Sequence, residues 1–245
     1  MFTTFRLLLI LVFLALSLHA AEKVTLTASD GVKVYGDFYP AASKSNPYIL
    51  LFHQAGSNRA EYVPIAPRLV ALGFNCIAID QRSGGSMWGQ NNETVKGIGH
   101  NSKYLETLKD MEAALAWARS SSNNGKVLVW GSSYSASLVF LLAAKHPDEI
   151  AAVLAFSPGE YFDNKHAVRD AASKVSVPIF VTSAKDQEEI DEAKSILATS
   201  PAQKKIQFIP QTAGVHGSST LRVDRNPTGE TENWKAVEAF LSAFK

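Results

Sequence analysis

The residue types and spacing that could do chemistry centre on Ser133. It stands two residues after Gly131, where the apolar run 126–130 ends and helix-forming residues begin. A serine at such a strand–turn–helix junction exposes its hydroxyl at the start of a helix, in a position to attack a carbonyl carbon. Ser132 and Ser135 are weaker candidates because neither has a glycine at the required offset, although serines also favour helix caps for purely structural reasons. The pattern predicts Ser133 as a nucleophile.

A nucleophilic serine needs a base, and His216 is the histidine best placed to act as one. It lies in the glycine-containing loop 212–218, after the last predicted strand, where a packing role is not evident. We expect it to take the Ser133 proton and return it to a leaving group. The other histidines stand in the leader, at a strand end, in an insertion or on helices: His19, His53, His100, His146 and His166.

The base in turn needs a carboxylate to orient it. Asp186 follows the predicted strand 178–183 and completes the chain order Ser, Asp, His. It is predicted to accept a hydrogen bond from the second ring nitrogen of His216 and to stabilise the imidazolium. Glu188 and Glu189 are nearby alternatives, but they begin a helix, where acidic residues are common for another reason.

Two backbone amides are expected to stabilise an oxyanion. The first is that of Tyr134, directly after the nucleophile. The second is predicted to be that of Gln54, because the loop His53-Gln54-Ala55-Gly56 follows an apolar strand over 48–53.

These side chains require a sheet whose strand ends meet at one edge. Two alternating segments, 23–28 and 32–39, surround the turn signal Asp30-Gly31 and predict an antiparallel hairpin. After residue 48, apolar strands alternate with helical patterns, which predicts an α/β fold: a mostly parallel, doubly wound sheet of about eight strands with helices on both faces. Strands are expected at 48–53, 74–80, 126–130, 150–156, 178–183 and 205–210, and helices at 62–72, 102–120, 134–146, 166–174, 188–198 and 230–244.

The polar segment 81–101 is too long for an ordinary connection and is interpreted as a lid-like insertion. It contains two bulky apolar residues, Met87 and Trp88, which are predicted to bind substrate as part of a pocket wall. A surface loop with one pinned tryptophan is the structural alternative. Tyr161 and Phe162 could line the same cleft.

Composition limits the function classes. The chain has 24 basic and 23 acidic residues, so no nucleic-acid or anionic membrane partner is expected. No metal-ligand cluster, phosphate-binding loop or dinucleotide fingerprint occurs, so no cofactor and no metal are implied. The one cysteine, Cys76, falls in a predicted buried strand and is interpreted as a core residue.

Residues 1–20 have the pattern of a secretory signal peptide. Arg6 precedes an apolar run that ends in small residues near Ala20, and this run is shorter than the roughly 20 residues of a spanning helix. An uncleaved anchor is the alternative. We expect a secreted or periplasmic protein with a single domain over 21–245 and no stable membrane insertion after cleavage.

The motifs Gly131-Ser132-Ser133-Tyr134-Ser135, 51–56, 184–186 and 215–217 together resemble those of the α/β-hydrolase superfamily, nearest its dienelactone-hydrolase-like and serine-esterase branch. Two departures are Ser135 and Gln54, each where a glycine is usual. Dienelactone hydrolases also use a cysteine nucleophile, so the resemblance favours a general esterase. It implies an ester or other acyl compound as the small-molecule substrate and an acyl-enzyme intermediate. A peptidase or amidase with the same triad, or a non-catalytic binding protein, are the alternatives.

Overall fold

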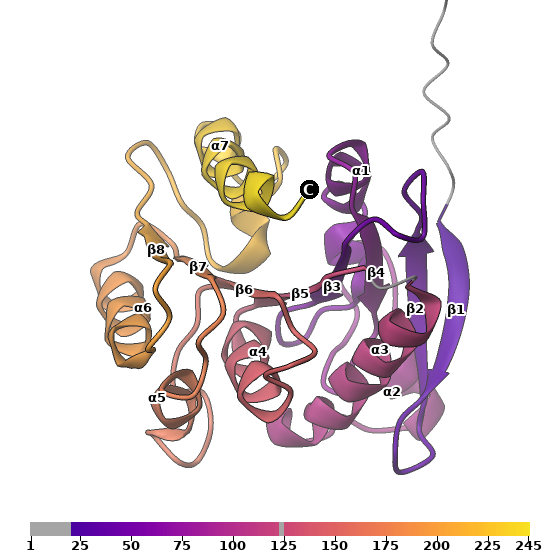
Figure 1. Ribbon diagram of the computed structural model, residues 1–245. Helices are drawn as coiled ribbons and strands as arrows, with labels where there is room; N and C mark the ends of the chain where they lie inside the picture. The colour runs from indigo at the N-terminus through magenta and orange to yellow at the C-terminus, as the bar shows by residue number, and fades with distance from the viewer. Residues whose placement is uncertain (1–20, 123–124) are drawn as a thin grey trace, which may run out of the picture.

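A twisted eight-stranded sheet forms the centre of the computed structural model, which describes residues 21–122 and 125–245 (Figure 1). The strand order is β1-β2-β4-β3-β5-β6-β7-β8. The first two strands form an antiparallel hairpin, β2 pairs antiparallel with β4, and the remaining neighbours are parallel. The predicted fold class is therefore confirmed. The strands are β1 Glu22–Thr27, β2 Lys33–Tyr39, β3 Tyr48–Phe52, β4 Asn75–Ile79, β5 Val127–Ser132, β6 Ala152–Phe156, β7 Ile179–Thr182 and β8 Lys205–Phe208.

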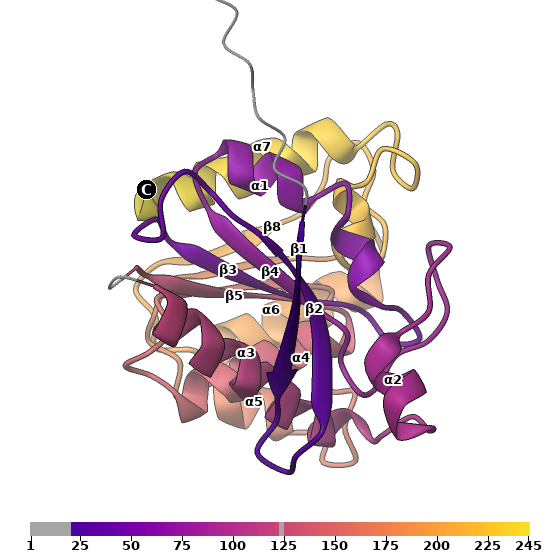
Figure 2. The ribbon, with the colours of Figure 1, turned by 90° about the vertical axis from the view of Figure 1, so that its right-hand side faces the viewer.

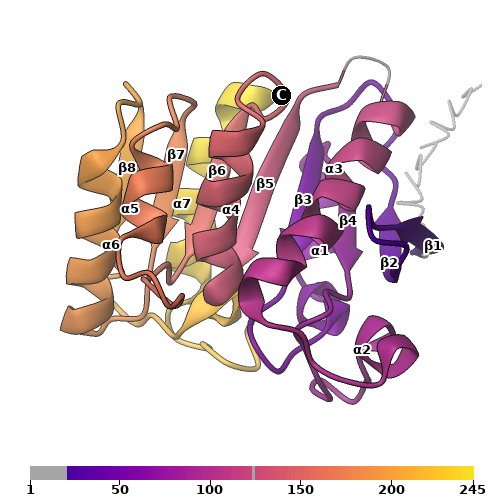
Figure 3. The same cartoon turned by 90° about the horizontal axis from the view of Figure 1, so that it is seen from below.

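Helices cover both faces of this sheet. On one face lie α1 and α7, and on the other lie α3, α4, α5 and α6, which Figure 3 shows side by side. A short helix, α2, lies beside the β1–β2 hairpin (Figure 2). The α-helices are α1 Ala66–Ala71, α2 Glu93–Ile98, α3 Leu108–Ser121, α4 Tyr134–Lys145, α5 Ala167–Ala172, α6 Gln187–Thr199 and α7 Glu230–Leu241, and the 3-10 turns are η1 Arg59–Tyr62, η2 Tyr104–Thr107, η3 Gly217–Leu221 and η4 Ser242–Phe244.

The central strands are apolar throughout because helices bury both of their faces. In β5, Val129 contributes to the core under α3–α6, while Trp130 contributes to the core under α1 and α7. The Trp130 ring stacks on Phe156 of the next strand, with centroids 4.3 Å apart. Each fully buried side chain of this size stabilises the fold by about 1.5–3 kcal/mol, so the strand that leads into Ser133 is firmly held.

Two predicted helices are interrupted. The segment 62–72 divides into η1, which ends at Tyr62, and α1, which begins at Ala66. Pro64 lies between them and lacks the amide hydrogen that a continuous helix would use. The segment 102–120 likewise begins with the 3-10 turn η2 before α3 starts at Leu108.

The insertion 81–101 is more ordered than its composition indicates. It contains α2, capped by the Asn92 side chain at its start and by Gly99 in the left-handed region (φ 81°) at its end. The Asn58 side-chain amide lies within 3.1 Å of three backbone carbonyls of the insertion, those of Gly85, Met87 and Gln90. These contacts fasten the segment to the body of the protein.

The predicted signal peptide, residues 1–20, lies outside the described residues, so export stays a prediction. Across residues 21–122 and 125–245, none of the helices has the length and apolar character needed to span a membrane.

Candidate active site

The turn after β5 holds Ser133 in a conformation that few non-glycine residues adopt. Its backbone has φ 59° and ψ −124°, and its amide donates to the Phe156 carbonyl at 2.8 Å. The preceding Gly131 is required there, because a Cβ atom would lie 2.1 Å from the carbonyl oxygen of Ser135. The helix α4 starts immediately afterwards. The backbone is thus strained where a nucleophile elbow would be.

Ser135 stands where a second glycine is usual, and its hydroxyl forms two buried hydrogen bonds. The Oγ atom donates to the His53 carbonyl at 2.7 Å and accepts from the Gln81 side-chain amide at 3.0 Å. It therefore links the start of α4 to the ends of β3 and β4, and the departure from glycine has a structural reason.

His216 reaches Ser133 from the loop before η3. Its Nε2 lies 2.7 Å from Ser133 Oγ, which is hydrogen-bond distance for a base that takes up the hydroxyl proton. The Nδ1 atom lies 2.7 Å from Oε1 of Glu189. This hydrogen bond is the main cause that raises the pKa of His216 above its ordinary value of 6.5, and burial opposes it.

The carboxylate that contacts His216 is Glu189, so the prediction of Asp186 for this position is corrected. Asp186 is the N-cap of α6, and its side chain accepts from the amides of Glu188 and Glu189 at 3.1 and 3.3 Å. Glu189 lies in the first turn of α6, and its longer side chain reaches the His216 ring. Burial raises the pKa of Glu189, but hydrogen bonds from His216, Ser157 and the Ala184 amide outweigh it, and the pKa falls to about 2. Glu189 is therefore ionised over the whole neutral range.

Ser157, directly after β6, contacts both the histidine loop and Glu189, and this role was not predicted from the sequence. Its Oγ accepts from the Gly217 amide at 2.9 Å, and its hydroxyl is also a hydrogen-bond partner of Glu189. Like Ser133, it has a positive φ of 59°. The adjacent strands β5 and β6 are thus each followed directly by a serine with positive φ that lies in the same site.

Of the two amides predicted to stabilise an oxyanion, one is free among the described residues and the other already has an acceptor. Tyr134 begins α4, so its amide is one of the first-turn donors that the helix itself leaves free. The Gln54 amide, by contrast, donates to Oε2 of Glu61 at 2.9 Å and is already engaged, which corrects its assignment. Within the described residues, the amide of Ala55, the next residue, has no hydrogen-bond acceptor.

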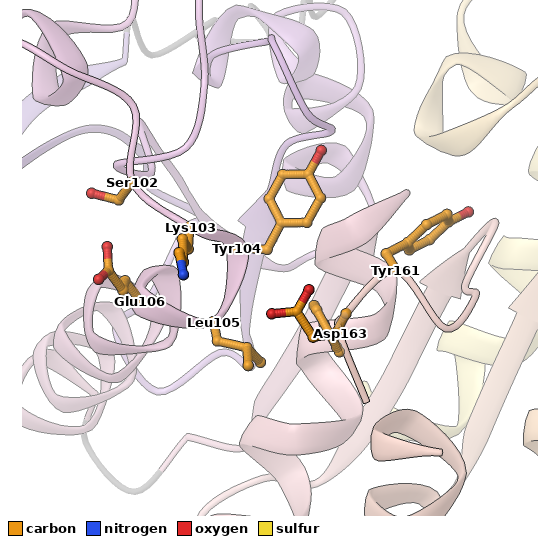
Figure 4. Close-up of a pocket in the computed structure, with 8 residues that line it drawn as sticks. Ser102, Lys103, Tyr104, Leu105, Glu106, Tyr161 and Asp163 are labelled. Atoms are coloured by element: carbon orange, nitrogen blue, oxygen red, sulfur yellow. The ribbon is translucent and has the colours of Figure 1, made fainter. Parts of the chain in front are cut away.

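A hollow of about 430 Å³ opens between η2 and the segment after β6. Figure 4 shows Tyr104 and Tyr161 approaching it from these two elements, and Leu105 and Phe162 add apolar surface. The Tyr104 ring stacks on Tyr134, the residue after the nucleophile, at a centroid distance of 4.4 Å. A second hollow, of about 480 Å³, shares Tyr161 and includes His216 and Glu189. The first hollow is thus partly aromatic and aliphatic, whereas five carboxylates line the second, which adjoins the site through His216.

Met87 and Trp88 lie on the insertion, and their role as substrate contacts stays a prediction. Among the described residues, neither lines the two hollows that share Tyr161. The Trp88 indole nitrogen donates to Ser57 Oγ at 2.9 Å, and the Arg222 guanidinium lies 3.8 Å from the ring centroid. Met87 packs near the Gln54 side chain, whose amide nitrogen is 3.8 Å from its sulfur. Trp88 is thus a pinned residue of the insertion, which was the structural alternative.

Comparison with known proteins bears on the fold. A family model described as the alpha/beta hydrolase fold matches residues 47–177. The quorum-quenching protein AidA of Acinetobacter baumannii is 30% identical over 134 residues, which cover 53% of this chain and 41% of that protein. The chain thus spans well under half the length of this relative.

Solved structures share the whole fold. A dienelactone hydrolase from Anabaena variabilis superposes with a TM-score of 0.71 at 16% identity, covering 92% of this chain and 99% of that one. The esterase Pf2001 of Pyrococcus furiosus gives a TM-score of 0.65 at 20% identity, with 91% and 92% covered. At such identities the likeness concerns the fold alone.

Proposed function

Because this chain belongs to the α/β-hydrolase family, we propose that it is a serine hydrolase that cleaves a small carboxylic ester. The observation that carries the proposal is the continuous chain of short hydrogen bonds from Ser133 through His216 to Glu189. A strained elbow, a base at 2.7 Å and an ionised acid behind it form the arrangement expected of an activated serine.

In the proposed reaction, Ser133 Oγ attacks the ester carbonyl while His216 Nε2 removes its proton. Glu189 holds the ring and stabilises the imidazolium, which then protonates the leaving alcohol oxygen as the carbon–oxygen bond breaks. The acyl group remains on Ser133. In the second half, His216 takes a proton from water, the resulting hydroxide attacks the acyl carbon, and Ser133 leaves with the proton restored.

The negative charge that develops on the carbonyl oxygen needs two donors. The Tyr134 amide is the first. We assign the second to Ala55 rather than Gln54, since the Gln54 amide is held by Glu61 and the Ala55 amide has no other acceptor in the part of the chain that the structure describes.

A fluorophosphonate probe tests the proposal directly. Such a probe reacts only with an activated serine, so we expect the folded protein to become labelled, and mass spectrometry of its peptides to locate the adduct on Ser133. Heat-denatured protein is the control and should not react. A native protein that resists the probe would contradict the proposed function and favour a binding protein. A panel of esters, lactones and peptides would then separate an esterase from a peptidase or amidase with the same triad.

The aromatic hollow supports an apolar acyl or alcohol group as part of the substrate. Replacing Tyr104 with alanine removes one wall, so we expect KM for an aryl ester to rise about tenfold, in line with about 1–3 kcal/mol for a pocket contact. KM for the corresponding acetate should change less than about threefold, since a small group makes few of these contacts. Steady-state kinetics on both esters measure the difference.

The matched control is Val223→Ala, which trims an apolar side chain that is 66% exposed. Val223 lines the surface beside Trp88 rather than the hollow beside Tyr104. Equal effects of Tyr104→Ala on both esters would show that the hollow does not bind the substrate.

A further inference from the structure

Glu61 is a fully buried carboxylate that the proposed reaction does not use. It lies in η1, has no exposed surface, and forms no ion pair in the described part of the chain. Burial raises its pKa, although hydrogen bonds from Ser132 and the Gln54 amide and the charge of Arg222 oppose this. A buried acid without an ion pair is costly, and its hydrogen bonds indicate what it does.

Both carboxylate oxygens accept a hydrogen bond from a segment of the candidate site. Oε2 accepts from the Gln54 amide at 2.9 Å, in the loop that carries the proposed oxyanion donor. Oε1 accepts from Ser132 Oγ at 2.7 Å, directly before the nucleophile. One side chain thus ties the oxyanion loop to the elbow.

Ser132 extends the link to the histidine loop. Its Oγ accepts from the Ser218 amide at 2.9 Å, two residues after His216. Because that oxygen accepts from an amide, its own hydrogen is free to point at Glu61, so the donors and acceptors form one consistent chain. The position of His216 relative to Ser133 therefore depends on the same carboxylate.

We propose that Glu61 is a positioning residue for ester hydrolysis, which holds the oxyanion loop, the elbow and the histidine loop in their reactive arrangement. This inference depends on the proposed function. A carboxylate accepts at both oxygens, whereas a glutamine of the same size accepts at one oxygen and donates from its amide nitrogen. Its N–H group would either face the Gln54 amide or make the Ser132 hydroxyl turn and accept, which changes the link to the elbow. The role also has an electrostatic part, since Glu61 in η1 and Glu189 in α6 are the carboxylates whose charges favour protonated His216.

The test is Glu61→Gln. We expect a folded protein whose kcat falls at least tenfold while KM changes less than threefold, because the donors and the base are displaced but the hollow beside Tyr104 is not. The acidic limb of the kcat/KM profile should move to lower pH, since the imidazolium loses one stabilising charge. Fluorophosphonate labelling of Ser133 should continue more slowly.

The matched control is Asp110→Asn, which also removes a buried carboxylate that accepts from a backbone amide, that of Arg82 at 2.8 Å. It should lower the melting temperature but leave kcat within about threefold and the acidic limb in place. If Glu61→Gln behaves in the same way, Glu61 is merely structural and the proposal is overturned.

A second variant covers the case in which Glu61→Gln does not fold. Ser132→Ala removes the link from Glu61 to the elbow and to Ser218, so kcat should fall with KM nearly unchanged. Unchanged kcat in this variant would also overturn the inference. A wild-type protein that neither labels nor turns over an ester would instead contradict the proposed function itself, which keeps the two failures distinct.

Discussion

Replacing Ser133 with alanine is expected to remove turnover of an activated ester almost completely, with kcat/KM reduced by about 10⁴- to 10⁶-fold. The variant loses the atom that forms the acyl-enzyme, and the residual rate would come only from binding and the oxyanion donors. The substitution also removes no core contact, because the Ser133 hydroxyl faces the site, where its Oγ lies 2.7 Å from His216 Nε2. Circular dichroism and the melting temperature should therefore stay close to those of the wild type.

Ser135→Gly is the matched control for this prediction. It restores the residue usual at that position and removes the hydrogen bonds to His53 and Gln81, at a cost of about 1 kcal/mol each. Its kcat should remain within about tenfold of the wild type. A Ser133→Ala protein that retains its ester turnover would exclude the acyl-enzyme mechanism.

The second large effect concerns the acid. Glu189→Gln is expected to lower kcat by about 10³- to 10⁴-fold, because a neutral amide neither fixes the tautomer of His216 nor stabilises its charged form. The direction of the pH effect follows from the raised pKa of His216. Activity needs the neutral ring and is lost as pH falls through that raised pKa. Without Glu189 the pKa drops, so the acidic limb of the residual kcat/KM moves to lower pH.

Asp186→Ala separates the two candidate acids. Loss of the α6 N-cap should lower the free energy of unfolding by about 1 kcal/mol while kcat stays within about threefold. Denaturant titration and steady-state kinetics on the same preparation measure both quantities. A large loss of kcat in Asp186→Ala with a small one in Glu189→Gln would contradict the assignment of Glu189.

The contact between Ser133 and His216 could be predicted because strand and turn patterns determine where these residues stand. The carboxylate beside His216 could not, because the strand end directs attention to Asp186, the first carboxylate after it. Which carboxylate reaches the imidazole depends on side-chain length and on the direction of the first turn of α6. That direction is set by tertiary packing, which the local sequence pattern does not reveal. Glu189 was visible only as one of several acids at a helix start, where such residues stabilise the helix anyway.

The contacts of the oxyanion loop and the structure of the insertion were also not predictable from local sequence patterns. The engagement of the Gln54 amide depends on Glu61, seven residues later, whose burial no local pattern indicates. In the insertion, Asn92 and Gly99 are good cap signals for α2, but the six-residue helix between them is too short for a clear periodicity. The strands and the longer helices were predictable because each combines a sustained apolar pattern with a distinct end.

The order of the site along the chain affects when the proposed activity can begin. The nucleophile lies near the middle of the sequence, but Glu189 and His216 belong to the last quarter, which must fold against β5 and β6 before the three groups meet. A growing or partly folded chain would carry a serine without its base. The arrangement thus ties reactivity to completion of the fold.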